Sequence, residues 1–178
     1  PHGLELYTPK FEKKLIFSGD PSRFPHIVDW KHSTPLHVYA TRAEGVDYSK
    51  VHLEGWRTQQ ELLLELSKGG GFGLVWGNSE NPAEERDYYK ENVSYKLTTY
   101  LAAGIPVVVP DYLSNADYIR EKGLGFVVSS LEEASRVVQE CTVEEYDQMV
   151  TRAKYTAYLI KNGYFTKKLF IDSMMLLD

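Results

Sequence analysis

Short apolar runs alternate along the chain with segments in which apolar residues recur every three or four positions. The short runs have the composition of strands and lie at residues 14–18, 36–40, 51–54, 73–76, 107–109 and 126–128. The other segments predict a short helix through 27–30, helices that begin at 58, at 92 or 94, at 115 and at 130, and a helical tail from 143 with a break near 162–163. Strands that alternate with helices predict a parallel sheet covered on both faces. We therefore expect an α/β fold: a Rossmann-like, doubly wound parallel sheet of about six strands with a helical C-terminal tail.

Residues at the ends of these helices support the same segments. Thr58 and Glu61 have the spacing of a capping box, in which each side chain bonds to the backbone N–H of the other residue. Ser130 and Glu133 repeat that spacing. Gly104 is expected to end the helix that begins at 92 or 94, because glycine readily adopts the left-handed backbone found at helix ends.

The helix before Gly104 carries the strongest sign of chemistry. Asn92 or Ser94 can cap its first turn, and Lys96 and Tyr100, four residues apart, share one face. A lysine so near a helix N-terminus opposes the helix dipole, but it suits a site that binds phosphate. Two interpretations stay open: Lys96 binds a diphosphate, or it is a solvent-exposed lysine beside a packing tyrosine.

Other basic residues fall in loops that follow predicted strands. In a doubly wound sheet, ligands bind beyond the carboxyl ends of the strands, where the strand order reverses. The loops at that edge are 19–23, 39–42, 55–57, 77–92 and 110–115. They contain Arg23, Arg42 and Arg57 and lead into the Lys96 helix, so we expect a cluster of cations at this edge. The loop at 78–91 is long and polar, as functional or mobile loops often are.

Composition narrows the class of protein. The chain has 178 residues, a net charge of −5 and an ordinary share of apolar residues, which predicts one globular domain and argues against a surface that binds nucleic acid or membranes. No apolar run approaches the roughly 20 residues of a membrane span. The single cysteine, Cys141, cannot form an internal disulfide, so we expect a cytoplasmic protein. Because Pro1 opens the chain, we interpret residues 1–10 as a linker from a missing N-terminal domain and residues 11–178 as the domain itself.

Several alternative sites are disfavoured by spacing. The glycines at 69–73 follow a helix and precede a strand, so they indicate a helix end and a turn rather than a dinucleotide-binding loop. The histidines lack the spacing of metal ligands, and no G-x-S-x-G elbow surrounds Ser94 or Ser114. We expect neither a metal nor a cofactor. Glu91 is either a surface carboxylate or a contact for a sugar hydroxyl, and the acidic residues at 80–87 indicate a solvated loop.

Five segments together resemble the C-terminal domain of GT-B glycosyltransferases. They are Val-His-Leu-Glu-Gly-Trp at 51–56, Gly-Leu-Val-Trp at 73–76, Ser-Tyr-Lys-Leu-Thr-Thr-Tyr-Leu-Ala-Ala-Gly-Ile-Pro-Val-Val-Val at 94–109, Asn-Ala-Asp-Tyr-Ile at 115–119 and Leu-Gly-Phe-Val-Val at 124–128. The K-x-x-x-Y-x-A-A-G-x-P-V part is the most specific. The chain is similar in particular to bacterial glucosyltransferases that extend glycans on serine-rich repeat adhesins, and to related β-1,6-galactofuranosyltransferases.

The resemblance implies a nucleotide-sugar-binding half of a GT-B fold that uses a UDP-sugar donor and a glycan or glycoprotein acceptor. Arg23 would approach the donor phosphates, and Trp56 and Arg57 would flank the uracil. The residues that we expect to bind the donor are Arg23, Tyr39, Trp56, Arg57, Glu91, Ser94, Tyr95, Lys96, Leu97, Thr98, Thr99 and Tyr100. The missing N-terminal domain would complete the cleft, so the fragment alone would transfer no sugar, and it could form homo-oligomers.

At one position this sequence departs from the family pattern, so not every residue role known in the family can be assigned here. Many retaining members carry two glutamates eight positions apart, and the second holds the ribose. Here Glu91 fills the first position and Thr99 the second, so the ribose contact, the anomeric outcome and the catalytic residue stay open. The alternatives are a nucleotide-sugar epimerase or synthetase, which the missing G-x-G-x-x-G disfavours, and a non-catalytic nucleotide-binding or subunit-assembly module.

Overall fold

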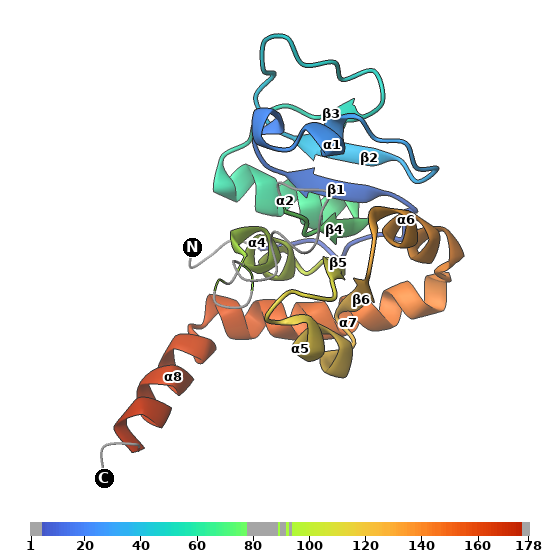
Figure 1. The fold of residues 1–178 in the computed structure, drawn as a ribbon. Helices are drawn as coiled ribbons and strands as arrows, with labels where there is room; N and C mark the ends of the chain where they lie inside the picture. Colours follow the sequence, from blue (N-terminus) through green and yellow to red (C-terminus); the bar gives the residue numbers. More distant parts are fainter. Residues whose placement is uncertain (1–4, 78–88, 90–91, 93, 176–178) are drawn as a thin grey trace.

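A six-stranded parallel sheet forms the centre of the molecule (Figure 1). The computed structural model describes residues 5–77, 89, 92 and 94–175. The strand order is β3-β2-β1-β4-β5-β6, so the chain winds outward from β1 in one direction and then from β4 in the other. This confirms the doubly wound parallel sheet. The strands are β1 (Leu15–Ser18), β2 (Leu36–Tyr39), β3 (His52–Leu53), β4 (Phe72–Leu74), β5 (Val107–Pro110) and β6 (Gly125–Val128).

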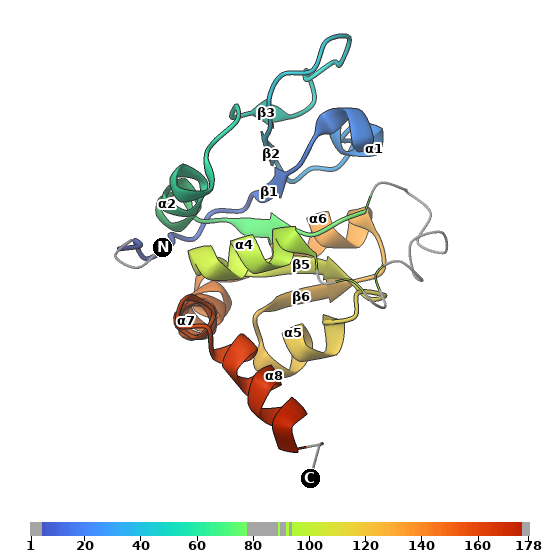
Figure 2. The same ribbon diagram turned by 90° about the vertical axis from the view of Figure 1, so that its left-hand side faces the viewer.

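Helices cover both faces of the sheet. α2 and α4 lie on one face, toward the viewer in Figure 2, and α1 and α6 lie on the other, while α7 crosses the molecule beside α4. The described helices are η1 (Pro21–Arg23), α1 (Pro25–Val28), α2 (Gln59–Gly69), α4 (Tyr95–Ala103), α5 (Ala116–Lys122), α6 (Leu131–Glu140), α7 (Val143–Lys161) and α8 (Tyr164–Met175).

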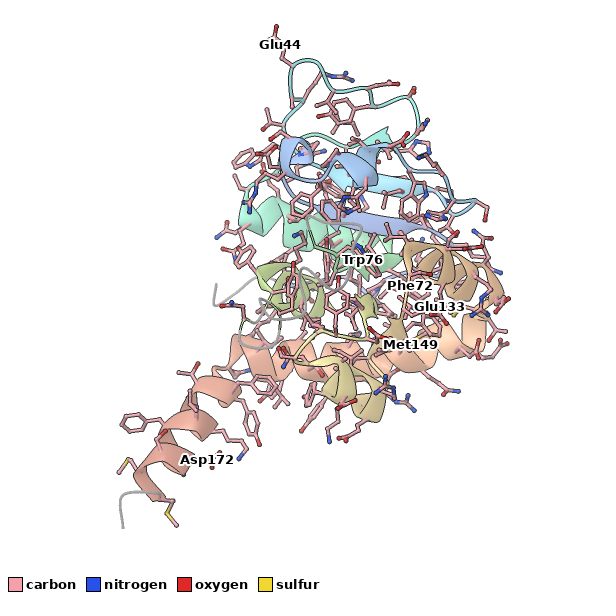
Figure 3. The ribbon with its side chains drawn as sticks, in the orientation of Figure 1. Glu44, Phe72, Trp76, Glu133, Met149 and Asp172 are labelled. Carbon is pink, nitrogen blue, oxygen red and sulfur yellow. The ribbon has the colours of Figure 1, made fainter. Side chains whose placement is uncertain are left out.

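The sheet separates two apolar cores, because successive side chains of a strand point to opposite faces. In β1, Leu15 and Phe17 pack into the core under α1 and α6, whereas Ile16 packs into the core under α2 and α4. Phe72, Trp76 and Met149 belong to the first of these cores, while Glu44 projects from the loop between β2 and β3 (Figure 3). The sheet therefore holds its carboxyl edge between two packed layers.

The predicted capping residues act as expected at two of the three helices. Thr58 accepts a hydrogen bond from the backbone N–H of Glu61 (3.3 Å), and the Glu61 carboxylate accepts one from the N–H of Thr58 (2.9 Å). Ser130 caps α6 by accepting from the N–H of Glu133 (3.1 Å), but the Glu133 carboxylate accepts from the N–H of Ser129 (2.8 Å), so the reciprocal bond of a capping box is not formed there. Ser94 is the N-cap residue of α4, but its side chain makes no capping hydrogen bond, so the prediction that the Ser94 side chain caps this helix is wrong.

The edge strand β3 is shorter than predicted, whereas the helical tail breaks where the sequence predicted. β3 contains only His52 and Leu53 of the predicted strand at 51–54, because the N–H of Val51 bonds to Tyr48 in a turn (3.2 Å). The helical tail breaks as predicted, with Asn162 at the end of α7 and Gly163 in the left-handed region (φ 65°). None of the residues of α8 is buried, and this helix extends away from the sheet (Figure 1).

Candidate functional site

The two central strands, β1 and β4, mark the point where the strand order reverses. Their register joins Leu15 to Phe72 and Ile16 to Gly73, whereas β1 and β2 stay paired as far as Ser18 and Tyr39. At its carboxyl end, β1 is therefore paired with β2 on one side but is not paired with β4 on the other. In open α/β sheets, the point where the strand order reverses leaves a crevice beyond the carboxyl ends of the strands, and ligands bind there.

Lys96 lies directly over the carboxyl end of β1. A Cβ atom added to Gly19 would lie 3.3 Å from Lys96 Cε, so the lysine side chain crosses the backbone just after the strand. Lys96 Nζ lies 4.4 Å from the centre of the Phe24 ring and 5.0 Å from that of Phe17, within the range of cation–π contacts. The Lys96 side chain is half-buried, and its ammonium group lies beside these two rings at the carboxyl end of β1.

Arg23 approaches the same aromatic ring from η1. Its guanidinium carbon lies 6.0 Å from the centre of the Phe24 ring. The turn that carries it is held by Asp20, whose carboxylate accepts hydrogen bonds from the N–H (3.0 Å) and hydroxyl (2.8 Å) of Ser22. Those bonds also keep the pKa of Asp20 below its ordinary value. The fold therefore brings Lys96 and Arg23 together around Phe24, as expected for a site that binds an anion.

Arg57 occupies a different part of the same edge. Its Nε donates to Glu65 of α2 at 2.5 Å, and its Nη1 donates to the carbonyl of Trp56 at 3.1 Å. Tyr39 lies beside this ion pair, and its burial, together with the Glu65 carboxylate, raises its pKa to about 12. Arg57 is thus held rigidly, with its charge balanced by Glu65, and is suited to orient a planar group rather than to neutralise phosphates.

Trp56 offers a large exposed ring next to Arg57. Its side chain is 65% exposed, whereas Trp30 and Trp76 are buried. An exposed tryptophan on a loop at the ligand-binding edge can stack on a planar base. Arg42 lies in the next loop, where it packs on the ring of Tyr48 at 5.0 Å, so it belongs to that loop rather than to the group around Phe24.

Helix α4 separates the residues that were expected to act together. Tyr95 is exposed and Ser94 partly so, while the side chains of Leu97, Thr99 and Tyr100 are buried. The Thr99 hydroxyl donates to the carbonyl of Tyr95 at 3.0 Å, one turn earlier in the same helix. Any role of the three buried side chains in binding is therefore one of positioning, and their assignment to the donor site stays a prediction.

Thr98 faces away from Lys96, because residues two apart on a helix point in different directions. With Leu97 and Leu101 it lines a cavity of about 360 Å³ that is closed by residues of α5, α7 and α8, among them Tyr118 and Phe165. The structure thus places Thr98 in a mostly apolar groove on the far side of α4. It does not bring Thr98 to the crevice beside β1.

Three further expectations concern Glu91 with its acidic neighbours, a metal site and a membrane span. Glu91 and the acidic residues at 80–87 lie outside the described residues. Among residues 5–77, 89, 92 and 94–175, no group of three or more His, Cys, Asp or Glu side chains is placed to hold a metal ion. Within the same part of the chain, no helix combines the length and apolar character that a membrane span requires.

The sequence pattern alone did not single out Phe17, Phe24 or Glu65, and it gave Gly73 no role beyond a turn and the start of a strand. Phe17 and Phe24 pack edge to face, with ring centres 4.9 Å apart, and the ammonium group of Lys96 lies over both rings. The one signal that was available is Gly73, since a glycine between apolar strand residues often marks a close approach of another group. Here that group is the ring of Tyr100.

Comparison with known proteins finds similarity over nearly the whole chain. Residues 15–173 match the family described as "Glucosyltransferase 3-like, C-terminal domain". The chain is 55% identical over 175 residues to Glucosyltransferase 3 of Streptococcus gordonii, with 98% of this chain and 52% of that protein covered. It is 27% identical over 157 residues to the β-1,6-galactofuranosyltransferase WbbI of Escherichia coli K12, with 86% and 47% covered. The chain thus spans about half the length of these relatives.

A solved structure supports the fold. Anabaena Alr3699/HepE, crystallised in complex with UDP-glucose, superposes with a TM-score of 0.53 at 12% identity, with 83% of this chain and 44% of that one covered. A doubly wound parallel sheet is the architecture of each half of a GT-B glycosyltransferase and also of other nucleotide-binding proteins, so the family is assigned from the sequence match. The chain belongs to the family of Glucosyltransferase 3-like C-terminal domains.

Proposed function

We propose that this chain is the donor-binding half of a glycosyltransferase that transfers a hexose, glucose or galactofuranose, from a UDP-sugar to a glycan or glycoprotein acceptor. The observation that carries the proposal is the position of Lys96, which crosses the carboxyl end of β1 at the switch point of the sheet. A diphosphate bound there meets one cation from α4 and a second, Arg23, from the β1–α1 turn. The names of the relatives, and the UDP-glucose bound by HepE, support a nucleotide sugar as ligand.

Each group at the edge has a separate task in this proposal. Lys96 and Arg23 neutralise the charge that develops on the diphosphate as the bond between the sugar carbon and the phosphate oxygen breaks. Trp56 stacks on the uracil, and Arg57, held by Glu65, donates to its planar edge. The acceptor hydroxyl oxygen forms the new bond to the sugar carbon and releases its proton, while UDP leaves with the electron pair of the broken bond. The acceptor is held by a part of the enzyme outside this chain.

Because the chain covers about half of its relatives, we propose that it binds donor but transfers no sugar by itself. The remaining half would supply the acceptor site and close the cleft over the donor. The exposed apolar residues of α8, such as Phe170 at 68% exposure, also favour contact with another polypeptide. A subunit-assembly module with no transferase role is therefore the second candidate function.

Ligand binding by the purified chain separates the two candidates. Thermal unfolding is measured with UDP, with uridine and with NAD, since a ligand that binds only the folded state raises the melting temperature by mass action. We expect UDP to stabilise the chain more than uridine does, because only UDP carries the diphosphate, and we expect no effect of NAD. A melting temperature unchanged by UDP would favour the assembly module. Sugar turnover by the 178-residue chain would contradict the proposal that it needs another half.

A further inference from the structure

Tyr100 links α4 to the end of β1 through a buried hydrogen bond. Its side chain is fully buried, and its hydroxyl oxygen accepts a hydrogen bond from the backbone N–H of Ser18 at 2.8 Å. The two residues are 82 positions apart in the sequence. Ser18 is the last residue of β1 and immediately precedes Gly19, over which Lys96 lies.

The ring of Tyr100 reaches β1 by crossing β4 at a glycine. A Cβ atom added to Gly73 would lie 2.3 Å from Cγ of the tyrosine, closer than any real contact. The ring thus fills the space that a side chain at position 73 would need. Gly73 and Tyr100 form a matched pair, and the absent side chain in β4 allows the phenol to enter between the strands.

The hydroxyl of Tyr100 takes the place of a β4 carbonyl as the hydrogen-bond acceptor for the end of β1. The N–H groups of Leu15 and Gly19 donate to carbonyls of Pro35 and Tyr39, on the β2 side of the strand. Because alternate N–H groups of a strand point to opposite neighbours, the N–H of Ser18 points toward β4. It meets the hydroxyl of Tyr100 instead of a carbonyl of β4. The side chain therefore ends the β1–β4 ladder where the crevice begins.

We propose that Tyr100 is a positioning residue that holds the end of β1 apart from β4 and so keeps the phosphate-binding crevice open beneath Lys96. The inference rests on the proposed function, and it changes the role of Tyr100 from a direct contact to a support. The buried hydroxyl acts on the ligand through the backbone at Ser18 and Gly19. Loss of the Tyr100 hydroxyl should therefore weaken the binding of the phosphates, which reach the crevice, and should not change the binding of the base.

The chain contains a matched control for this test. Tyr146 of α7 is also fully buried, and its hydroxyl donates to the carbonyl of Gly71 at 3.1 Å, before the opposite end of β4. Tyr100→Phe and Tyr146→Phe each delete one hydrogen bond between a buried phenol and the backbone and keep the ring. We expect the two variants to lose similar amounts of thermal stability, but only Tyr100→Phe to bind UDP more weakly, by roughly three- to tenfold. Uridine affinity should stay unchanged in both.

Binding is measured by isothermal titration calorimetry, and amide hydrogen exchange at Ser18 by NMR. UDP affinity of Tyr100→Phe equal to that of the unmodified chain, or an equal loss in Tyr146→Phe, would overturn the inference while leaving the proposed function intact. If the unmodified chain fails to bind UDP, the proposed function fails, and the positioning role fails with it. Exchange at Ser18 that is not faster in Tyr100→Phe would by itself exclude the support.

Discussion

Lys96 Nζ lies 4.4 Å from the centre of the Phe24 ring, and this contact places a cation from α4 over the turn that follows β1. The ring also approaches Arg23, so one aromatic side chain orients two cations that come from distant parts of the sequence. A lysine held in this way loses less conformational freedom when an anion binds than a mobile surface lysine does.

Removing the lysine tests the phosphate site directly. Lys96→Ala should weaken UDP binding by about 1.5–3 kcal/mol, the usual contribution of a charge-assisted hydrogen bond, and should leave uridine binding nearly unchanged. Titration calorimetry measures both affinities. Lys68→Ala, in the last turn of α2, removes the same charge from an exposed helix position and serves as the control. Equal UDP affinities of Lys96→Ala and Lys68→Ala would exclude this role.

Trp56 should contribute to the binding of the base. Trp56→Ala is expected to weaken both UDP and uridine by about 1–3 kcal/mol, the value of one base stacked on an aromatic side chain. Because the other two tryptophans are buried, quenching of the exposed tryptophan fluorescence by UDP should disappear in this variant. Tyr155→Ala, which removes a ring of similar exposure on α7, should change neither signal. Quenching that persists without Trp56 would place the base elsewhere.

Substitution by alanine should lower the stability of the fold at Gly73 but raise it at Gly69. Gly73→Ala should destabilise the fold by about 1–3 kcal/mol or more, because the new methyl group collides with Tyr100. Gly69→Ala should stabilise it by roughly 0.5–1 kcal/mol, since Gly69 lies in α2 and its Cβ would meet Lys14 Nζ only at 3.7 Å. Urea unfolding measures both. A neutral Gly73→Ala variant would contradict the close packing of the tyrosine ring.

Acid should destabilise the protein through the capping carboxylates. Hydrogen bonds from Thr58 and Thr142 lower the pKa values of Glu61 and Glu145 below the ordinary value of 4.5. A carboxyl whose pKa is lower in the folded state stabilises the fold above its unfolded pKa, and this stabilisation is lost as pH falls through the folded value. Urea unfolding should therefore show falling stability below about pH 4.5. Glu145→Gln should flatten that decline, and an equally steep decline in this variant would contradict the contribution of its carboxylate.

Local signals in the sequence predicted most of the architecture. The alternation of apolar runs with helical periods indicated the parallel sheet, and the spacing of Thr58 and Glu61 indicated a cap that the structure confirms. These features depend on residues within one or two turns of each other, so a short stretch of sequence contains all the information. The sequence also pointed to Lys96, because a lysine in the first turn of a helix is itself a local irregularity.

The tertiary structure alone decided how the candidate site is assembled. The hydrogen bond between Tyr100 and Ser18 spans 82 residues, and the seat of Lys96 on Phe24 likewise joins α4 to the turn after β1. Such contacts depend on how α4 packs on the sheet, which no local pattern specifies. The sequence by itself determined the strands, the helices and the family of this protein. Only the packed fold decided that Lys96 and Arg23 share one aromatic ring, that Thr98 faces another groove, and that Tyr100 supports the crevice from within, because side chains become neighbours only when the two cores close around the sheet.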